Sequence, residues 1–283
     1  MASVLVVLFC VSLPVILSYG GKISEANGRP LIRRTAQNVH LRRRLQHATC
    51  GVAISAGYKW VIRDARTVVA LLSLTCACML ALHQLRCRVK RVNDLYLRLV
   101  GVLLRPHEIR GLPGAFWFVL GATLAVAIFP RDVALQSVLH LSLGDPVASI
   151  VGVKMGDRNR VLPAGKSLAG SLAAFMTCAT VTLLLFGWCR EDEALGESPR
   201  IFGHPSTTTS GHSSIQYSGA LGGCTAGSEV SDASLVLTAI LGGFSGVVGE
   251  ALPLGVDDNL SMPLVSGAIF LALQKYVGEP GPF

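Results

Sequence analysis

Two groups of polar residues stand between apolar segments of this sequence, and their side chains are of types that do chemistry. The first group lies in residues 141–175 and holds Asp145 and the run Gly165-Lys166-Ser167. The second holds Glu250 and the run at 257–259. An ionisable side chain beside hydrocarbon costs roughly 2.5–3.5 kcal/mol on insertion, which favours a functional role over a packing role. Together they indicate an active site at a membrane surface.

Gly165-Lys166-Ser167 is predicted to open a helix. The free N–H groups and partial positive charge of a helix N-terminus suit a phosphate group, and Lys166 adds a point charge. The run is not a Walker A loop, because arginine stands at position 160 where that motif has glycine. The alternative is structural: Lys166 as an orientation signal and Ser167 as an N-cap.

Asp145 follows an apolar run and precedes Pro146, which we expect to bend or break the helix at 133–153. Backbone groups freed there would line a polar cavity. Asp145 would then bind the metal ion of a nucleotide or accept a proton from a lipid hydroxyl. The alternative is an aspartate paired with an arginine or a helix end.

Asp257, Asp258 and Asn259 supply hard oxygen atoms, which Mg²⁺ prefers together with triphosphate oxygens. The alternative is a solvated acidic turn. Glu250 shares a helix face with Gly242 and Gly246, whose spacing allows close helix packing, so we expect Glu250 to face the bundle interior. Its alternative role is a buried interhelical hydrogen bond.

Two further residues are candidates at the edges of apolar segments. His47, beside basic residues, is placed to touch phosphate, although a lone interfacial histidine also occurs without a role. Glu108 is predicted either to bind metal or to pair with Arg105 or Arg110.

Composition identifies the class of protein. The chain is 51% hydrophobic and 15% charged, against about 25% charged for a typical soluble domain. Its net charge of +8 comes from loops between apolar runs. That distribution fits lipid headgroups and orientation signals and argues against nucleic acid. The eight cysteines form no Cys-x-x-Cys motif, which argues against a zinc site.

The predicted fold class is all-α, a polytopic integral membrane protein with seven or eight transmembrane helices. Residues 1–20 lack a preceding basic region, which favours a retained anchor over a cleaved signal peptide. The expected spans are 1–20, 48–62, 66–85, 112–130, 133–153, 167–189, 233–254 and 260–277, with a tight hairpin at 63–66.

Basic loops predict the orientation. Residues 22–47, 86–110 and 154–166 are rich in Lys and Arg, and alternating spans place all three on one side, which is expected to be cytosolic. The acidic, Ser- and Gly-rich segment 190–232 falls on the other side as a flexible lumenal loop. The expected organisation is therefore an N-terminal anchor and basic cytosolic segment (1–47) followed by a membrane-embedded domain (48–277).

Several blocks of this sequence carry a family resemblance, and they follow in order: R-R-L-Q-H at 43–47, H-E-I-R-G at 107–111, G-D-P-V-A-S-I-V-G at 144–152, G-K-S-L-A-G-S-L-A-A-F at 165–175 and G-E-A-L-P-L-G-V-D-D-N-L-S-M-P-L at 249–264. Through them, residues 42–270 resemble the CTP-dependent lipid kinases of diacylglycerol, dolichol and phytol. They are distantly similar to phosphatidate cytidylyltransferases. The 165–175 and 250–264 blocks look most like diacylglycerol kinase.

The resemblance implies transfer of the γ-phosphoryl group of CTP to the hydroxyl of diacylglycerol, with Mg²⁺, on the cytosolic face of the endoplasmic reticulum. It implies nucleotide and metal roles for Asp145, Lys166, Asp258 and Asn259, with Glu108 and Glu250 in support. Alternatives that remain open are a dolichol, polyprenol or phytol acceptor, ATP as donor, cytidylyl transfer to phosphatidate, and a transporter of small molecules or lipids. The absence of a visible internal repeat argues against a transporter.

Overall fold

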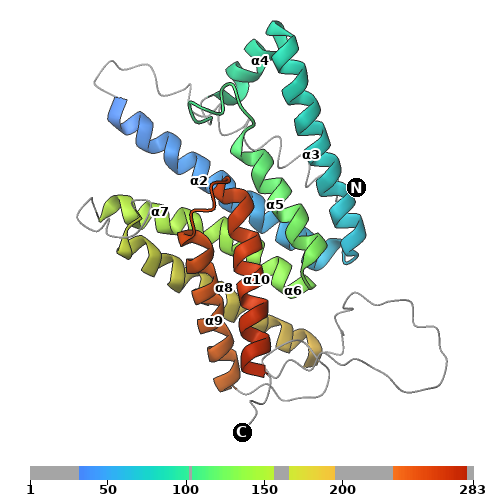
Figure 1. The fold of residues 1–283 in the computed structure, drawn as a ribbon, viewed down its shortest axis with the longest axis vertical. Helices are drawn as coiled ribbons and strands as arrows, with labels where there is room; N and C mark the ends of the chain where they lie inside the picture. The colour runs from blue at the N-terminus through green and yellow to red at the C-terminus, as the bar shows by residue number, and fades with distance from the viewer. Residues whose placement is uncertain (1–31, 102–103, 156–165, 195–231, 279–283) are drawn as a thin grey trace, which may run out of the picture.

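Helices are the regular elements of the computed structural model, which describes residues 32–101, 104–155, 166–194 and 232–278. The predicted all-α class is confirmed for this part of the chain (Figure 1). In chain order the elements are α2 (Ile32–Ala56), the π-helical turn η2 (Gly57–Val61), α3 (Ala65–Arg88), α4 (Lys90–Val100), α5 (Gly114–Ile128), α6 (Arg131–Leu139), the π-helical turn η4 (His140–Gly144), α7 (Asp145–Lys154), α8 (Leu168–Ala194), α9 (Asp232–Ala251) and α10 (Asp258–Gly278).

Four helices of the described chain are long and apolar enough to cross a bilayer: α3, α8, α9 and α10. They confirm the spans expected near 66–85, 167–189, 233–254 and 260–277. Large apolar side chains such as Leu74, Leu172 and Leu184 are more than half exposed on these helices, as expected where a helix faces lipid. The protein is therefore a polytopic α-helical membrane protein.

The remaining expected spans have other outcomes. Helix α5 is apolar but shorter than a full span. The span expected at 48–62 forms the end of α2 together with η2, and α2 already begins at Ile32, within the basic segment. Helix α8 continues to Ala194, into the expected loop at 190–232. Residues 1–20 and the rest of that loop lie outside the described residues.

Short local signals set where the helices begin and end. The Asp64 carboxylate accepts a hydrogen bond from the Thr67 backbone N–H at 2.8 Å and so caps α3, which follows η2 after the short link at 62–64. Helix α5 ends before Phe129-Pro130, and α6 begins directly after that proline. Asp257 caps α10 in the same way, accepting from the Asn259 N–H at 3.0 Å.

The helix expected at 133–153 is interrupted as predicted. It runs as α6, passes through η4, and returns to α-helical geometry at Asp145, one residue before Pro146. Proline has no N–H to donate to the preceding turn. A change of helix geometry at that point therefore leaves fewer backbone hydrogen bonds unmade than a continuous α-helix would. The interruption places Asp145 at the first turn of α7.

Close packing of α8 against α9 depends on small residues. A Cβ atom added at Gly246 would lie 2.7 Å from the Cys178 Cβ, and one added at Gly242 would lie 2.7 Å from the Thr182 Cβ. The predicted packing role of these glycines is confirmed. Helix α9 also packs on α10, α10 on α5, and α5 on α3, while α2 packs against α6, η4 and α7 (Figure 1).

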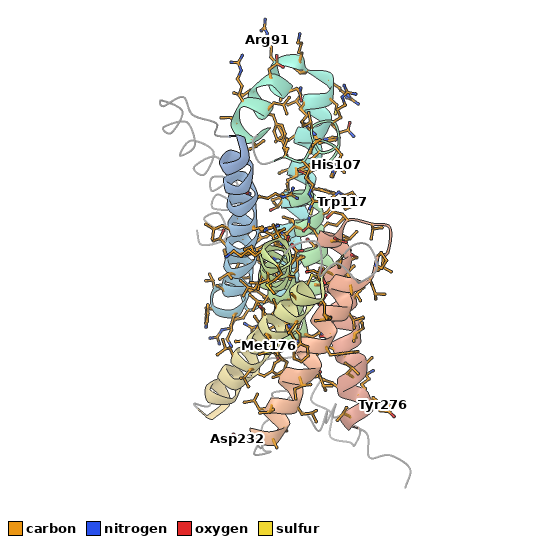
Figure 2. The ribbon with its side chains drawn as sticks, turned by 90° about the vertical axis from the view of Figure 1, so that its left-hand side faces the viewer. Arg91, His107, Trp117, Met176, Asp232 and Tyr276 are labelled. Atoms are coloured by element: carbon orange, nitrogen blue, oxygen red, sulfur yellow. The ribbon has the colours of Figure 1, made fainter. Side chains whose placement is uncertain are left out.

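The two ends of the molecule differ in the loops they carry. Arg91 and His107 lie toward one end, while Asp232 and Tyr276 lie at the other (Figure 2). The loop that carries His107 therefore lies on the same side of the molecule's centre as the basic segment after α3.

Candidate active site

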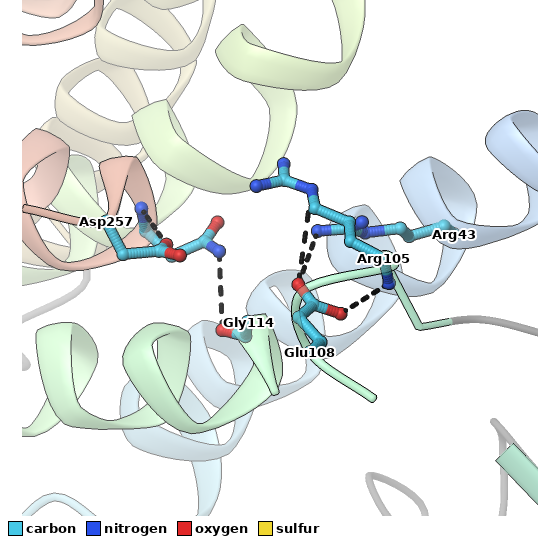
Figure 3. A network of polar contacts seen from close by, with 6 residues as sticks. Arg43, Arg105, Glu108, Gly114 and Asp257 are labelled. Atoms are coloured by element: carbon cyan, nitrogen blue, oxygen red, sulfur yellow. Dashed lines mark hydrogen bonds and ion pairs between the residues drawn. The ribbon is translucent and has the colours of Figure 1, made fainter. Parts of the chain in front are cut away.

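A buried carboxylate, Glu108, forms the centre of a polar network between α2 and the loop that precedes α5 (Figure 3). Its side chain is only 3% exposed. Glu108 Oε1 lies 3.3 Å from Arg43 Nη2 and 4.0 Å from Arg105 Nε, and Oε2 accepts from the Arg105 N–H at 2.9 Å. Of the two roles predicted for Glu108, the structure shows the ion pair, with Arg105 as predicted and Arg43 in addition.

Arg86, at the end of α3, holds the loop that carries Glu108. Its guanidinium donates to the carbonyl oxygens of Ile109 at 3.0 Å, Glu108 at 3.2 Å and Gly111. Arg86 is 4% exposed and packs over the Tyr96 ring of α4. Three carbonyl acceptors satisfy a buried cation, so the loop is fixed to the end of α3.

Asn259 connects the second polar group to this network. Its amide donates to the Gly114 carbonyl at 3.3 Å. A Cβ atom on Gly114 would lie 3.0 Å from Glu108 Oε1, 3.1 Å from Asn259 Nδ2 and 3.3 Å from Arg43 Nη2. Only a residue without a side chain fits there comfortably, so Gly114 brings polar groups from three segments to one point.

Asp145 faces a mixed field of charges. It interacts electrostatically with Asp258, Lys166, Arg44 and Arg105. The same helix α7 is attached to α2, because Arg44 donates to the Ser149 hydroxyl. The structure therefore brings Asp145, Asp258 and Lys166 into one electrostatic neighbourhood, although they are far apart in sequence.

Lys166 forms an ion pair with Glu250, the two charged atoms lying 2.9 Å apart. The lysine also donates to the Glu250 backbone carbonyl at the end of α9. Ser167 is buried, and its hydroxyl accepts from the Gly170 N–H at 3.0 Å, so it caps α8. The capping role predicted for Ser167 is confirmed, while Gly165 lies outside the described residues.

His47 is enclosed at the edge of the same region. Its ring packs edge-on against Phe118 at 4.6 Å, and its Nε2 is buried without a hydrogen-bond partner within the described chain. Burial, followed by the positive charge of Arg43, lowers the pKa of His47 from 6.5 to about 4. The imidazole is therefore neutral at neutral pH. Its Nε2 atom remains available for one hydrogen bond.

The three carboxylates predicted to bind metal do not form a ready-made cage. Among the residues that the structure describes, no group of three or more His, Cys, Asp or Glu side chains is placed to hold an ion. Asp257 is engaged in capping α10, whereas Asp258 is exposed. A Mg²⁺ ion that arrives on a triphosphate needs only one or two protein carboxylates, and Asp145 with Asp258 suits that requirement.

Four arginines of this region were not among the predicted site residues: Arg43, Arg44, Arg86 and Arg105. The positive-inside rule accounts for every arginine in a basic loop in the same way and so does not distinguish those that make specific contacts. Arg43 and Arg44 stand in the R-R-L-Q-H block, which was the available signal for two of them.

These features define a class: a multi-pass helical membrane protein with a cationic and carboxylate-bearing site where α2, α7, α8, α9 and α10 meet. Comparison with known proteins identifies the family. The chain is 31% identical over 194 residues to "CTP-dependent diacylglycerol kinase 1" of Eremothecium gossypii, covering 68% of this chain and 54% of that protein. It is 30% identical over 184 residues to the protein of that name from Saccharomyces cerevisiae, covering 65% and 56%.

The protein of that name from Schizosaccharomyces pombe is 31% identical over 179 residues, covering 62% of this chain and 67% of the relative. The chain belongs to the CTP-dependent diacylglycerol kinase family. It spans about half the length of the first two relatives. No family model matches the chain, and no solved structure matches it.

Proposed function

We propose that this protein transfers the γ-phosphoryl group of CTP to the hydroxyl of diacylglycerol, giving phosphatidate and CDP. One observation carries the proposal: Asp145, at the start of α7, lies within the fields of the three cations Lys166, Arg44 and Arg105 and of a second carboxylate, Asp258. Such a site offers cations to phosphate oxygens and a carboxylate to a hydroxyl, while the helices around it face lipid. This combination suits phosphoryl transfer to a lipid hydroxyl, the kind of activity for which its relatives are named.

Each residue is given a role by its position. Asp145 accepts the proton of the lipid hydroxyl as that oxygen forms a bond to the γ-phosphorus and the bond to the CDP oxygen breaks. Lys166 neutralises charge on the transferred group, and Glu250 holds the ammonium in place at 2.9 Å. Asn259 and Glu108 fix the segment on which the nucleotide would rest.

Mg²⁺ is part of this proposal. Asp258 and one carboxylate oxygen of Asp145 would hold it, which leaves the other Asp145 oxygen to accept the proton, and when bound the ion would neutralise charge on the nucleotide phosphates. The membrane is proposed to be that of the endoplasmic reticulum, with the site facing the cytosol, where nucleoside triphosphates are found. The basic loops 86–110 and 154–166 support this orientation.

The test is an assay of purified protein with CTP labelled either at the α- or at the γ-phosphate. We expect γ-label, and no α-label, to appear in lipid when diacylglycerol is the acceptor, and the Asp145→Asn variant to give background counts. ATP, dolichol and phytol serve as parallel arms. Transfer of α-label to phosphatidate would instead show a cytidylyltransferase, and labelling of dolichol or phytol alone would overturn the acceptor.

A further inference from the structure

An apolar groove lies between α2, η2, α6, η4 and α8, and none of the candidate site residues lines it. It encloses about 210 Å³. Its walls include Val52 and Ala56 of α2, Leu139 of α6, Leu143 of η4 and Leu184 of α8. Val52 is 43% exposed and Leu184 66% exposed, so the groove opens toward the surrounding lipid.

One end of the groove adjoins the proposed active site. Leu143 stands two residues before Asp145, and Val52 stands five residues after His47 on the same helix. The hydrogen bond from Arg44 to Ser149 joins α2 to α7 at this end. The groove therefore begins close to the helical segments that carry Asp145 and His47.

The other end of the groove lies at η2. Lys59 and Trp60 line it there, next to Leu135. Arg131, the first residue of α6, donates to the backbone carbonyl oxygens of Tyr58 at 2.9 Å and Lys59 at 2.6 Å and closes α2 onto α6.

The dimensions select the kind of occupant. From Val52 to Trp60 the helix rises about 12 Å, which approaches the roughly 15 Å depth of one hydrocarbon leaflet. The volume is below the roughly 300–1,000 Å³ of pockets that enclose a whole drug-sized ligand, so it accommodates one chain rather than two. The buried Ser55 hydroxyl has no hydrogen-bond partner among the described residues, and one hydroxyl in an apolar wall could not hold a nucleotide.

We propose that this groove binds one fatty-acyl chain of the lipid substrate and so positions the free hydroxyl of that lipid beside Asp145. The inference rests on the proposed function and adds the element that recognises the lipid. The second chain would stay in the bilayer. Turnover should then depend on the length of the bound chain, because each methylene that fits the groove contributes to binding.

A photo-crosslinking experiment tests occupancy without any need for turnover. The full chain in phosphatidylcholine nanodiscs is irradiated with a diacylglycerol that carries a diazirine near the end of one acyl chain. We expect adducts in the segments 52–60 and 135–143, mapped by mass spectrometry, and their loss when unlabelled diacylglycerol is added. Adducts elsewhere only, or equal competition by added phosphatidylcholine, would overturn the proposal, the second result indicating a general lipid site.

A pair of substitutions tests the consequence for selectivity. Ala56→Phe fills the groove, whereas Ala77→Phe adds the same ring to an exposed alanine of α3 outside the groove. The ratio of turnover on dioleoylglycerol to turnover on dioctanoylglycerol should fall about tenfold or more in Ala56→Phe and stay unchanged in Ala77→Phe. An unchanged ratio in both variants would also overturn the proposal.

The two proposals fail in different ways. If the wild-type protein crosslinks specifically in the groove but transfers no γ-label from CTP to diacylglycerol, the proposed function is wrong and the acyl-chain site stands. If it transfers label with no groove adducts, the function stands and the acyl-chain site is wrong. Should Ala56→Phe fail to fold, the crosslinking of the wild-type chain still decides.

Discussion

Lys166 and Glu250 form an ion pair of 2.9 Å between the start of α8 and the end of α9, and both side chains are largely shielded from solvent. The second carboxylate oxygen of Glu250 is buried without a hydrogen-bond partner in the described chain. The lysine is therefore held in place before any phosphate arrives, and the carboxylate retains an unused acceptor. Glu250 has the contacts of a positioning residue for Lys166.

Lys166→Ala should abolish phosphoryl transfer while the protein inserts into membranes at normal levels. Lys166→Arg should restore little, because a planar fork replaces a compact ammonium beside Glu250. The matched control is Lys154→Ala, which removes an exposed positive charge at the end of α7. Activity and immunoblots of membrane fractions measure both effects, and similar losses in the two alanine variants would mean that Lys166 acts only as an orientation signal.

Asp145→Asn and Asp258→Asn should each reduce turnover by orders of magnitude, because both remove charge expected to hold one Mg²⁺–nucleotide. The turnover of the double variant should be little lower than that of the less active single variant. The effects of residues that act as a unit are not additive. Titration of rate against Mg²⁺ concentration should show a raised requirement in each single variant. Multiplied losses with an unchanged Mg²⁺ requirement would show that the two carboxylates do not share an ion.

Arg43→Ala should destabilise the fold more than Arg105→Ala, although both arginines contact Glu108. The side chain of Arg43 is 26% exposed and that of Arg105 50% exposed. The loss for Arg43 should fall somewhat below the about 3–5 kcal/mol found when a fully buried pair is broken. The loss for Arg105 should stay within about 1 kcal/mol, because its backbone N–H still donates to Glu108. Thermal unfolding in detergent compares the two, and equal losses would contradict this ranking.

The stability of the wild-type protein should fall as the pH is lowered from about 6.5 toward 4, in part because of His47. Burial holds the pKa of His47 at about 4 in the folded chain against an ordinary 6.5. The unfolded chain binds more protons in this window, so acid favours unfolding. His47→Gln should flatten the dependence of Tm on pH, whereas His107→Gln, at an exposed position, should leave it as in the wild type. Parallel curves for all three proteins would refute the assignment.

A glycosylation acceptor introduced near Ser210 should be modified in microsomes, and one near Asn93 should not. The expectation follows from the acidic segment 190–232 and the basic segment 86–110, which alternation of the spans places on opposite sides. A mobility shift removed by a glycosidase reports modification. The reverse pattern would exclude a cytosolic site.

Hydrophobic periodicity and charge gave the class of fold, the four long spans and the packing role of Gly242 and Gly246, because these depend on local sequence and on bilayer thickness. The geometry of η4 was not predictable. Its Ser142 faces Gly51 of α2, and His140 lies 3.1 Å from Thr182 of α8, so the turn depends on contacts with distant segments.

For the candidate site, residue type indicated which side chains carry chemistry but not their partners. The ion pair of Lys166 with Glu250 crosses from α8 to α9, and Asn259 reaches Gly114 from 145 positions away. Nothing in a local motif specifies such pairs. Arg86 is the clearest case, since its sequence context marks it as one more basic residue after a span, yet it binds three carbonyl oxygens.

The π-helical turn at His140–Gly144 makes the direction of Asp145 depend on the number of residues that precede it. A π-turn holds one residue more than an α-helical turn needs, and removing that residue rotates everything after it by about 100°. The helix would survive such a deletion intact and α-helical, with its carboxylate turned away from Lys166 and Arg44. A relative could thus lose this chemistry through a change in length alone, with every residue of the G-D-P-V-A-S-I-V-G block still in place.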